Sequence, residues 1–344
     1  MALESETDDE EKRRQEWRRL GRDLLIVAIL FGILLGGLFS YTRTWPPMVV
    51  IDSSSMQHGV ESSIGVIDTG DLILVQAVSS RADITTYVEG RATAYATYGD
   101  FGDVIVFRDP DEPESPVPII HRPIAFVHWN ASAGGYDVPD LALLPSTDWS
   151  ALDAAGRPTT NPFGLSAFVL HRAGWKQDLS IAFDLNRILV RASEDGFLTM
   201  GDNNAYTTLT KSDLWVVPLP TILGRARGEI PWFGLLKLTL FPQQSGCCEA
   251  WGSTDPVRGA PANSWAALDV SLVLLFGTPI LLATIDFYLD RHPDVRRRLR
   301  SRWDRFRRRI RSEKGPSPEE ALRERDESPG EAKTNEPGNE KEGT

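Results

Sequence analysis

The clearest structural signal in the sequence is the run Gly102-Asp103-Val104-Ile105-Val106-Phe107-Arg108, together with the later run Ile119-Ile120-His121-Arg122-Pro123-Ile124. Both runs are short and rich in β-branched residues, and a polar excursion at 109–118 separates them. Apolar runs of this kind, bounded by Gly, Pro and Asp, are typical of strands, so the pair predicts a β-hairpin. The returning strand of that hairpin would carry one histidine, His121.

The rest of the central region continues the β pattern. Similar short apolar runs occur at 48–51, 72–75, 188–190 and 196–200. No G-x-G-x-x-G phosphate loop and no alternation of strands with long helices occurs in the sequence. The sequence therefore predicts a mostly β domain over 45–262. The loop-rich segment at about 129–194, with several prolines, is predicted to be an insertion in that domain.

The charge of the chain is unevenly distributed. The net charge is −11, and residues 45–262 hold 25 acidic against 14 basic side chains, whereas both flanks are rich in Arg. Phosphate contact needs a basic face, so nucleic acid is not an expected partner of the central domain.

The two cysteines of the chain, Cys247 and Cys248, are adjacent. Neighbouring cysteines rarely bond to each other, so we expect two thiols and no disulfide framework. The sequence predicts no metal site and no cofactor.

An uncharged run from Leu24 to Thr42 follows an acidic lead at 1–11, which is expected to be disordered, and a basic cluster at 12–22. As a helix its 19 residues would span roughly 28 Å, close to the hydrocarbon thickness of a bilayer. A cleaved signal peptide is the competing interpretation, but the run is long and lacks a convincing small-x-small cleavage site. We expect a transmembrane helix at 24–42. Because basic residues precede it, 1–23 should be a cytoplasmic segment.

A second apolar stretch lies at 265–289. Its 25 residues are long enough to cross a bilayer when tilted, and a buried core helix is the alternative. Eleven Arg and one Lys follow at 291–314, as expected on the cytoplasmic side of a membrane helix and favourable for anionic lipid. We expect a second span, a cytoplasmic Arg-rich segment at 290–314 and a disordered tail at 315–344. The chain would be a multi-pass cell-membrane protein with both termini in the cytoplasm.

Serine and histidine residues provide the candidates for chemistry. The apolar run at 48–51 delivers the cluster Ser53-Ser54-Ser55-Met56 just beyond the first apolar helix. A serine nucleophile needs a base for its hydroxyl proton and donors for the oxyanion. His121 is a better candidate base than His171, because its strand directly follows the first arm of the hairpin. His58 is too close to the serines along the chain for in-line proton transfer.

Several motifs, in this order along the chain, resemble the signal peptidase I family. They are Ser53-Ser54-Ser55-Met56, Gly70-Asp71 with its apolar strand, Gly102–Phe107, His121-Arg122, Gly201-Asp202-Asn203-Asn204 and a closing Gly228–Gly234. Together they cover most of 46–240. A His at 121, where bacterial members carry Lys, makes the chain similar to the archaeal and endoplasmic-reticulum branch. The resemblance implies a signal-peptidase-like β-rich catalytic domain outside the membrane, flanked by two transmembrane helices.

Carried over by position, the resemblance implies a role for each site residue. Ser55 would be the nucleophile, and His121 the general base that later protonates the leaving amine. Asp202 would orient and electrostatically support the imidazole, or shape the site near it. The backbone N–H of Ser55 and the hydroxyl of Ser53 would be the oxyanion donors. This is a Ser/His/Asp division of labour.

The sequence departs from the family pattern near these residues. Ser54 stands where the family usually has Gly, and His58 where a Pro is common. The Ser–His branch usually has a second acid six residues after the aspartate, but here that position is Thr208 and the next acid is Asp213. Three alternatives follow. Asp202 is the only acid that supports the histidine, or a shifted loop brings Asp213 to it, or the activity is reduced.

The resemblance implies a membrane-bound serine endopeptidase that removes signal peptides from secreted preproteins. Its partners would be preproteins, membrane lipid and the protein-export machinery. The alternative is a catalytically silent homologue that binds a substrate or partner. The apolar run at 230–241 is expected either to touch the membrane interface or to form core strands.

Overall fold

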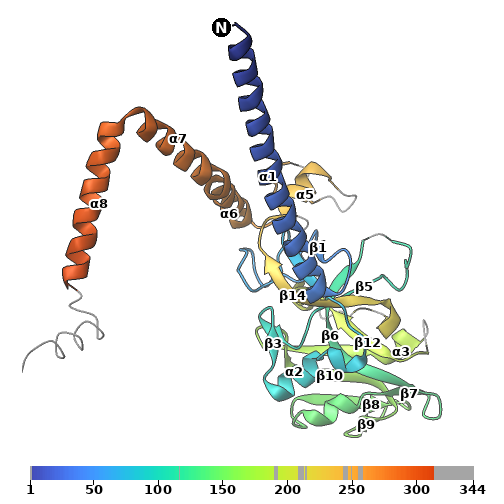
Figure 1. The fold of residues 1–344 in the computed structure, drawn as a ribbon. Coiled ribbons are helices and arrows are strands. Elements are labelled where there is room, and N and C mark those ends of the chain that lie inside the picture. The colour runs from blue at the N-terminus through green and yellow to red at the C-terminus, as the bar shows by residue number, and fades with distance from the viewer. Residues whose placement is uncertain are drawn as a thin grey trace, which may run out of the picture. The chain divides into compact units, whose positions relative to one another are not determined.

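A computed structural model describes residues 2–313, except 116, 190–192, 208–212, 214, 243–246, 249 and 255–258. The expected tail at 315–344 and Thr208 lie outside these residues. The chain divides into two compact units, one ending at Ser271 and the other beginning at Leu272. All of the described strands belong to the first unit (Figure 1).

One large antiparallel sheet forms the first unit. In the part of the chain that is described, twelve strands belong to it, in the order β1-β2-β14-β5-β6-β7-β10-β8-β9, with β11 beside β10 and β12 between β6 and β13. The strands are β1 (Met48–Val50), β2 (Leu72–Gln76), β5 (Ile105–Phe107), β6 (Ile119–Asn130), β7 (Gly135–Asp137), β8 (Trp149–Asp153), β9 (Pro158–Thr159), β10 (Leu165–Ala173), β11 (Leu179–Asp184), β12 (Gly196–Met200), β13 (Val216–Val217) and β14 (Ile222–Ile230). A separate ribbon pairs β3 (Ala96–Thr97) with β4 (Asp100–Phe101). The expectation of a β-rich domain with two apolar helices is confirmed.

The hairpin predicted from residues 102–124 is present. Its two arms are β5 and β6, with Ile105 opposite His121. β6 is twelve residues long, and it also pairs with β12, placing Arg122 opposite Met200. Successive side chains of a strand point to opposite faces, so His121 and Arg122 enter different surroundings. This alternation organises the functional site described below.

The segment expected to be an insertion, at about 129–194, holds β7 to β11. These strands pack around an apolar core in which Phe168 and Phe183 stack with ring centroids 4.7 Å apart. The same core includes side chains of β6 and β12, such as Ile124 and Leu198. β6 connects this part of the sheet to the rest, because its last residues pair with β7.

Two apolar runs are helical: one was predicted to be a strand, and for the other core strands were one of two alternatives. The run at 188–190 belongs to α3 (Leu185–Leu189), and its last residue lies outside the described part of the chain. The run at 230–241 ends β14 and then forms α5 (Gly234–Leu240). In both helices, apolar residues three positions apart are buried, Leu185 with Ile188 and Leu235 with Leu238. That spacing puts both side chains of each pair on one helical face, so packing against the sheet decides for a helix.

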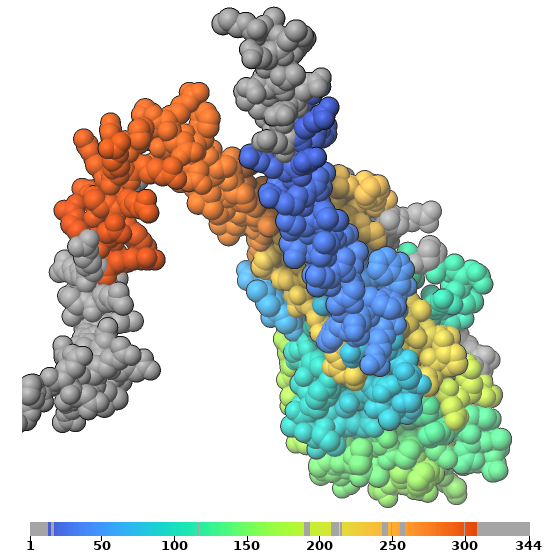
Figure 2. Space-filling view, viewed as in Figure 1, coloured from blue at the N-terminus to red at the C-terminus, as the bar shows by residue number. Residues whose placement is uncertain are grey.

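The first membrane-length helix is part of α1 (Ala2–Thr42), which appears in blue in Figure 1. Its later, apolar part is blue in Figure 2. Its segment Trp17–Thr42 is long and apolar enough to cross a membrane. Most apolar side chains of this segment are exposed, with Leu25 at 60% and Ile33 at 67%. The helix begins at Ala2, so the expectation of a disordered lead is wrong for the backbone. Four of the eleven residues of that lead are Glu, which is a good helix former.

The second membrane-length helix is Ala262–Arg291. It consists of α6 (Ala262–Leu272), a π-helical turn (Val273–Gly277) and α7 (Thr278–Arg291). Trp265 and Leu268, near its start, are buried, whereas later apolar side chains such as Ile280 are about two-thirds exposed. The alternative of a buried core helix therefore fits only the first turns. The helix α8 (Pro293–Glu313) follows.

The remaining helices are short. They are α2 (Tyr87–Thr93), α4 (Asn204–Thr207) and three 3-10 turns at Arg81–Asp83, Pro139–Leu143 and Leu219–Thr221. In α2, the Thr86 hydroxyl accepts from the Glu89 N–H and the Glu89 carboxylate accepts from the Thr86 N–H, a capping box that defines the helix start.

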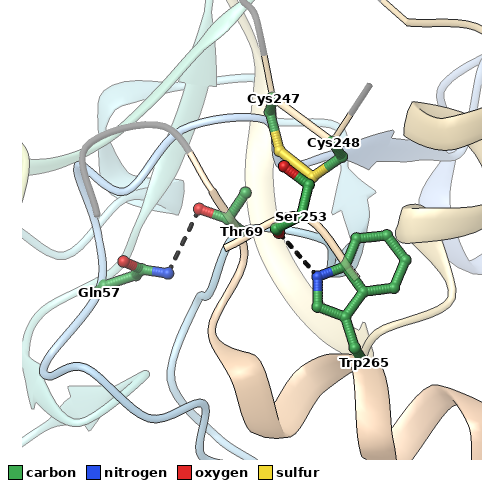
Figure 3. Close-up of a disulfide and its surroundings, with 6 residues drawn as sticks. All are labelled: Gln57, Thr69, Cys247, Cys248, Ser253 and Trp265. Atoms are coloured by element: carbon green, nitrogen blue, oxygen red, sulfur yellow. Dashed lines mark hydrogen bonds between the residues drawn. A yellow bond between two sulfur atoms is a disulfide. The ribbon is translucent and has the colours of Figure 1, made fainter. Parts of the chain in front are cut away.

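Cys247 and Cys248 are bonded to each other, which corrects the expectation of two thiols (Figure 3). Both residues are 1% exposed. Cys248 has a φ of 65°, a left-handed conformation that lets the two side chains turn toward each other. In the same region, the Trp265 indole donates to the carbonyl of Ser253 at 2.9 Å. The bond joins neighbours in the sequence, so it closes no long loop of the unfolded chain.

Candidate active site

Ser53, Ser55 and His121 line one surface groove of about 370 Å³. The serines follow β1, and the histidine is on β6. A second groove of about 630 Å³ has Val49 and Val50 in its wall as well. The two grooves therefore adjoin each other at β1, the strand that precedes the serine cluster.

His121 is held by Asp213. The ring Nδ1 lies 2.7 Å from Oδ2 of Asp213, and both side chains are about nine-tenths buried. Thr199 on β12 fixes this carboxylate, because its hydroxyl donates to the same Oδ2 at 2.6 Å and its carbonyl accepts from the Asp213 N–H at 3.1 Å. A carboxylate on Nδ1 favours the tautomer with the proton on that nitrogen. The other nitrogen, Nε2, is then the one that can accept a proton.

Nε2 of His121 faces the serine loop across Gly201. A Cβ at Gly201 would lie 3.0 Å from that Nε2 and 2.6 Å from the carbonyl oxygen of Ser55. Both atoms therefore approach the position that a side chain at residue 201 would occupy. Asn203 fastens the loop from the same side, because its N–H donates to the Ser55 carbonyl at 2.8 Å and its amide to the Ser54 carbonyl at 2.9 Å.

The hydroxyls of Ser53 and Ser55 are neighbours, with the two Oγ atoms 3.4 Å apart. Met56 follows them and is buried, 1% exposed, in the core cluster that includes Ile51. The serine segment is thus anchored by a buried apolar side chain on each side, Ile51 and Met56, while Ser53 remains exposed. Such an arrangement keeps a hydroxyl accessible on a loop whose backbone is held in place.

The charge environment raises the pKa of His121. Burial by itself would lower the pKa, but the nearby charge of Asp213, its hydrogen bond and the charge of Asp202 together outweigh burial. A base with a raised pKa is protonated over a wider range of pH than an exposed histidine. The site therefore titrates above the ordinary value of 6.5.

Asp202 does not make the direct contact with the His121 imidazole that the family resemblance implied. Its oxygens accept from Arg122, with Nε 2.8 Å from Oδ1 and Nη2 2.7 Å from Oδ2. The physical reason is the alternation along β6: Arg122 points away from the face of His121, and its buried charge takes the carboxylate of Asp202. Of the three alternatives left open by Thr208, the geometry favours the one in which Asp213 is brought in by the loop.

Arg122 and Asp202 form a buried ion pair, with side chains 1% and 3% exposed. Burial would raise the pKa of Asp202, but Arg122 outweighs it and holds the pKa below the usual range. The remaining N–H groups of Arg122 donate to the carbonyl oxygens of Thr97, Asp100, Phe101 and Gly102. The pair therefore ties β6 to the β3–β4 ribbon and to the loop after β12.

His58 is a site residue that sequence reasoning set aside. Its Nε2 lies 2.9 Å from Oδ2 of Asp202, and its ring stacks on Trp175 with centroids 4.7 Å apart. It links the serine loop to Asp202 and to the insertion that carries Trp175. The signal that was available is the departure from the family pattern, since His58 replaces a common Pro.

Two further histidines, His171 and His128, lie away from this site. His171 is placed between the hydroxyls of Ser150 and Ser180, each 3.1 Å from one ring nitrogen. His128 pairs with Asp195 on the surface, where both side chains are about half exposed. Among the residues described, no group of three or more His, Cys, Asp or Glu is arranged to hold a metal ion.

No protein-family model and no curated protein matches this sequence. The chemistry of the site is therefore judged from its geometry. Ser55 supplies a hydroxyl, His121 a ring nitrogen that can accept a proton, and Asp213 a carboxylate that holds the ring. These are the components of nucleophilic catalysis by an activated serine.

Proposed function

We propose that this chain is a membrane-bound serine endopeptidase that removes signal peptides from secreted preproteins. The observation that carries the proposal is the position of His121, between Asp213 on one side and the loop of Ser55 on the other, in the wall of a groove. Ser55 is the nucleophile, His121 the general base and Asp213 the acid that positions the base.

The mechanism follows from these positions. Nε2 of His121 takes the proton of the Ser55 hydroxyl as Oγ attacks the carbonyl carbon of the scissile peptide. Asp213 holds the proton on Nδ1 and stabilises the imidazolium that forms. The Ser55 N–H and the Ser53 hydroxyl donate to the oxyanion. His121 then gives its proton to the leaving amine, and water, activated by the same nitrogen, hydrolyses the acyl-enzyme.

An extended peptide fits beside β1. This strand is the first in the sheet order, and among the described strands it pairs only with β2, so we propose that an added strand can pair with its outer edge. The groove of about 630 Å³ next to it has mostly apolar walls and reaches Trp45, which is 69% exposed. An apolar segment leaving the bilayer would suit this groove. The family resemblance implies small substrate residues at positions −1 and −3 from the cleaved bond.

The proposed topology places the β domain outside the cell membrane and both termini in the cytoplasm. Its support is the pair of apolar helices together with the basic residues at 12–22 and 291–314. The reacting groups then lie close to the bilayer, where preproteins leave the export machinery. Membrane lipid and that machinery are the proposed partners, and no cofactor is needed.

Cleavage of a preprotein by the full chain in liposomes tests the proposal. We expect Ser55→Ala and His121→Ala each to lose at least about 10³-fold in rate. Ser54→Ala is the matched control, because it changes the same loop and should retain most of the activity. Equal cleavage by Ser55→Ala and the parent would contradict the assigned nucleophile. A folded parent without any cleavage would instead support the silent, substrate-binding homologue.

A further inference from the structure

The helix α8 has a pattern that the peptidase proposal does not use. It begins at Pro293, two residues after the end of α7, and the chain bends between the two helices (Figure 1). In the sequence, apolar residues recur at 295, 299, 303, 306 and 310. Spacings of three and four put these positions on one side of a helix, and arginines occupy most of the others.

The described aromatic side chains of this stripe are exposed. Trp303 is 55% and Phe306 53% exposed, and their ring centroids lie 5.7 Å apart. The guanidinium of Arg307 lies 5.8 Å from the Trp303 ring centroid. The helix therefore presents a compact aromatic patch with positive charge directly beside it.

The sequence of α8 contains far more basic than acidic side chains. Between Pro293 and Glu313 the acids are Asp294, Asp304 and Glu313, against ten arginines. Like charges one turn apart destabilise an isolated helix. A stable setting for α8 must therefore supply negative charge along one side and an apolar layer along the other. The interface of an anionic bilayer supplies both.

We propose that α8 lies flat on an anionic lipid surface beside the end of α7. Trp303 and Phe306 enter the boundary between headgroups and acyl chains, and the arginines bind lipid phosphates. Two observations favour lipid over nucleic acid. The aromatic stripe fits an acyl layer, and α7 ends a helix long and apolar enough to cross a membrane only two residues before α8 begins. The proposal does not depend on the peptidase activity.

The test uses the full chain in lipid nanodiscs, which leave both membrane faces accessible. An environment-sensitive fluorophore is placed on Phe306→Cys or, as the matched control, on Ser301→Cys, which lies on the opposite side of the helix. The native cysteines are bonded to each other and stay unlabelled. In discs with phosphatidylglycerol, emission from position 306 should shift to shorter wavelength and be quenched by doxyl-labelled lipid. Position 301 should remain aqueous.

Discs of pure phosphatidylcholine and a charge variant complete the test. The shift at position 306 should be smaller in phosphatidylcholine, smaller in high salt, and lost in the triple variant Arg298→Gln, Arg302→Gln, Arg305→Gln. Helicity of each variant is checked by circular dichroism. Equal emission from positions 301 and 306, or the same emission in both lipids, would overturn the proposal. A shift produced by added RNA but not by anionic lipid would do so as well.

Discussion

His121 and Asp213 are joined by a hydrogen bond of 2.7 Å across 92 positions of the sequence. Asp202, the acid that the family resemblance assigned to this histidine, is bound to Arg122 instead. Two neighbouring residues of β6 thus recruit two different carboxylates. One pair faces the serine loop, and the other joins the β3–β4 ribbon to the sheet.

Substituting each of the two acids in turn separates the proposed catalytic role of Asp213 from the structural role of Asp202. We expect Asp213→Asn to lose about 10²-fold or more in activity with little change in folding, because the imidazole loses its positioning anion. Asp202→Ala should instead destabilise the chain by about 3–5 kcal/mol, because it leaves the buried charge of Arg122 without its partner. Peptidase rate and the free energy of unfolding are measured for both. Full activity of Asp213→Asn would remove that residue from the mechanism.

The pH dependence of cleavage reports the His121–Asp213 pair. The base must be neutral to accept the serine proton, and its pKa is raised above 6.5. Activity should therefore fall on acidification at a higher pH than for an ordinary histidine. In Asp213→Asn the contribution of Asp213 to the raised pKa is lost and only that of Asp202 remains, so the residual activity should fall at a lower pH. The measurement is kcat/KM against pH for both proteins, and an unchanged or upward-shifted limb in the variant would contradict the pairing.

Gly201 is predicted to keep the base and the nucleophile loop close together. A Cβ there would meet the Ser55 carbonyl oxygen at 2.6 Å and Nε2 of His121 at 3.0 Å. Gly201→Ala should reduce the rate by about 10²-fold, because small displacements of reacting groups have effects of that size. Gly59→Ala is the control, since nothing lies within 4 Å of a Cβ at that position. Similar rates for the two variants would show that the close approach is not needed.

Thermal stability should decrease between pH 5.5 and pH 8. Burial raises the pKa of Asp71 from 3.8 to about 7, and burial together with Asp202 raises that of Asp100 to about 6. At pH values between the ordinary aspartate pKa of 3.8 and these raised pKa values, the folded chain keeps protons that the unfolded chain has released. Rising pH therefore favours unfolding. The raised pKa of His121 acts in the same direction, because its stabilising charge is lost as pH rises.

The variant Asp71→Asn tests the origin of that slope. The native Asp71 side chain is fully buried and accepts hydrogen bonds from the N–H groups of Trp232 and Asp68. The change in Tm between the two pH values should be smaller in Asp71→Asn than in the parent. The exposed Glu61→Gln should behave like the parent. A slope that survives unchanged in Asp71→Asn would assign it to other groups.

Local patterns predicted the parts of the fold that depend on neighbouring residues. The hairpin of β5 and β6 follows from two β-branched runs separated by polar residues, and both apolar helices follow from their length and composition. The helices α3 and α5 were missed because each run is too short for its periodicity to distinguish a helix from a strand. The bond between Cys247 and Cys248 was missed because it depends on the left-handed turn at Cys248.

Patterns in the sequence predicted a β-rich domain and two apolar helices, and the family resemblance pointed to Ser55 and His121 as candidates. The pairing of Asp213 with His121 and of Asp202 with Arg122 depends on the tertiary structure. The spacing of acids along the chain cannot show this, because alternation on β6 sends His121 and Arg122 to opposite faces and the long-range pairing of β12 brings Thr199 and Asp213 to one of them. A hydrogen-bonded pair separated by 92 positions is set by strand register, and register is a property of the folded sheet.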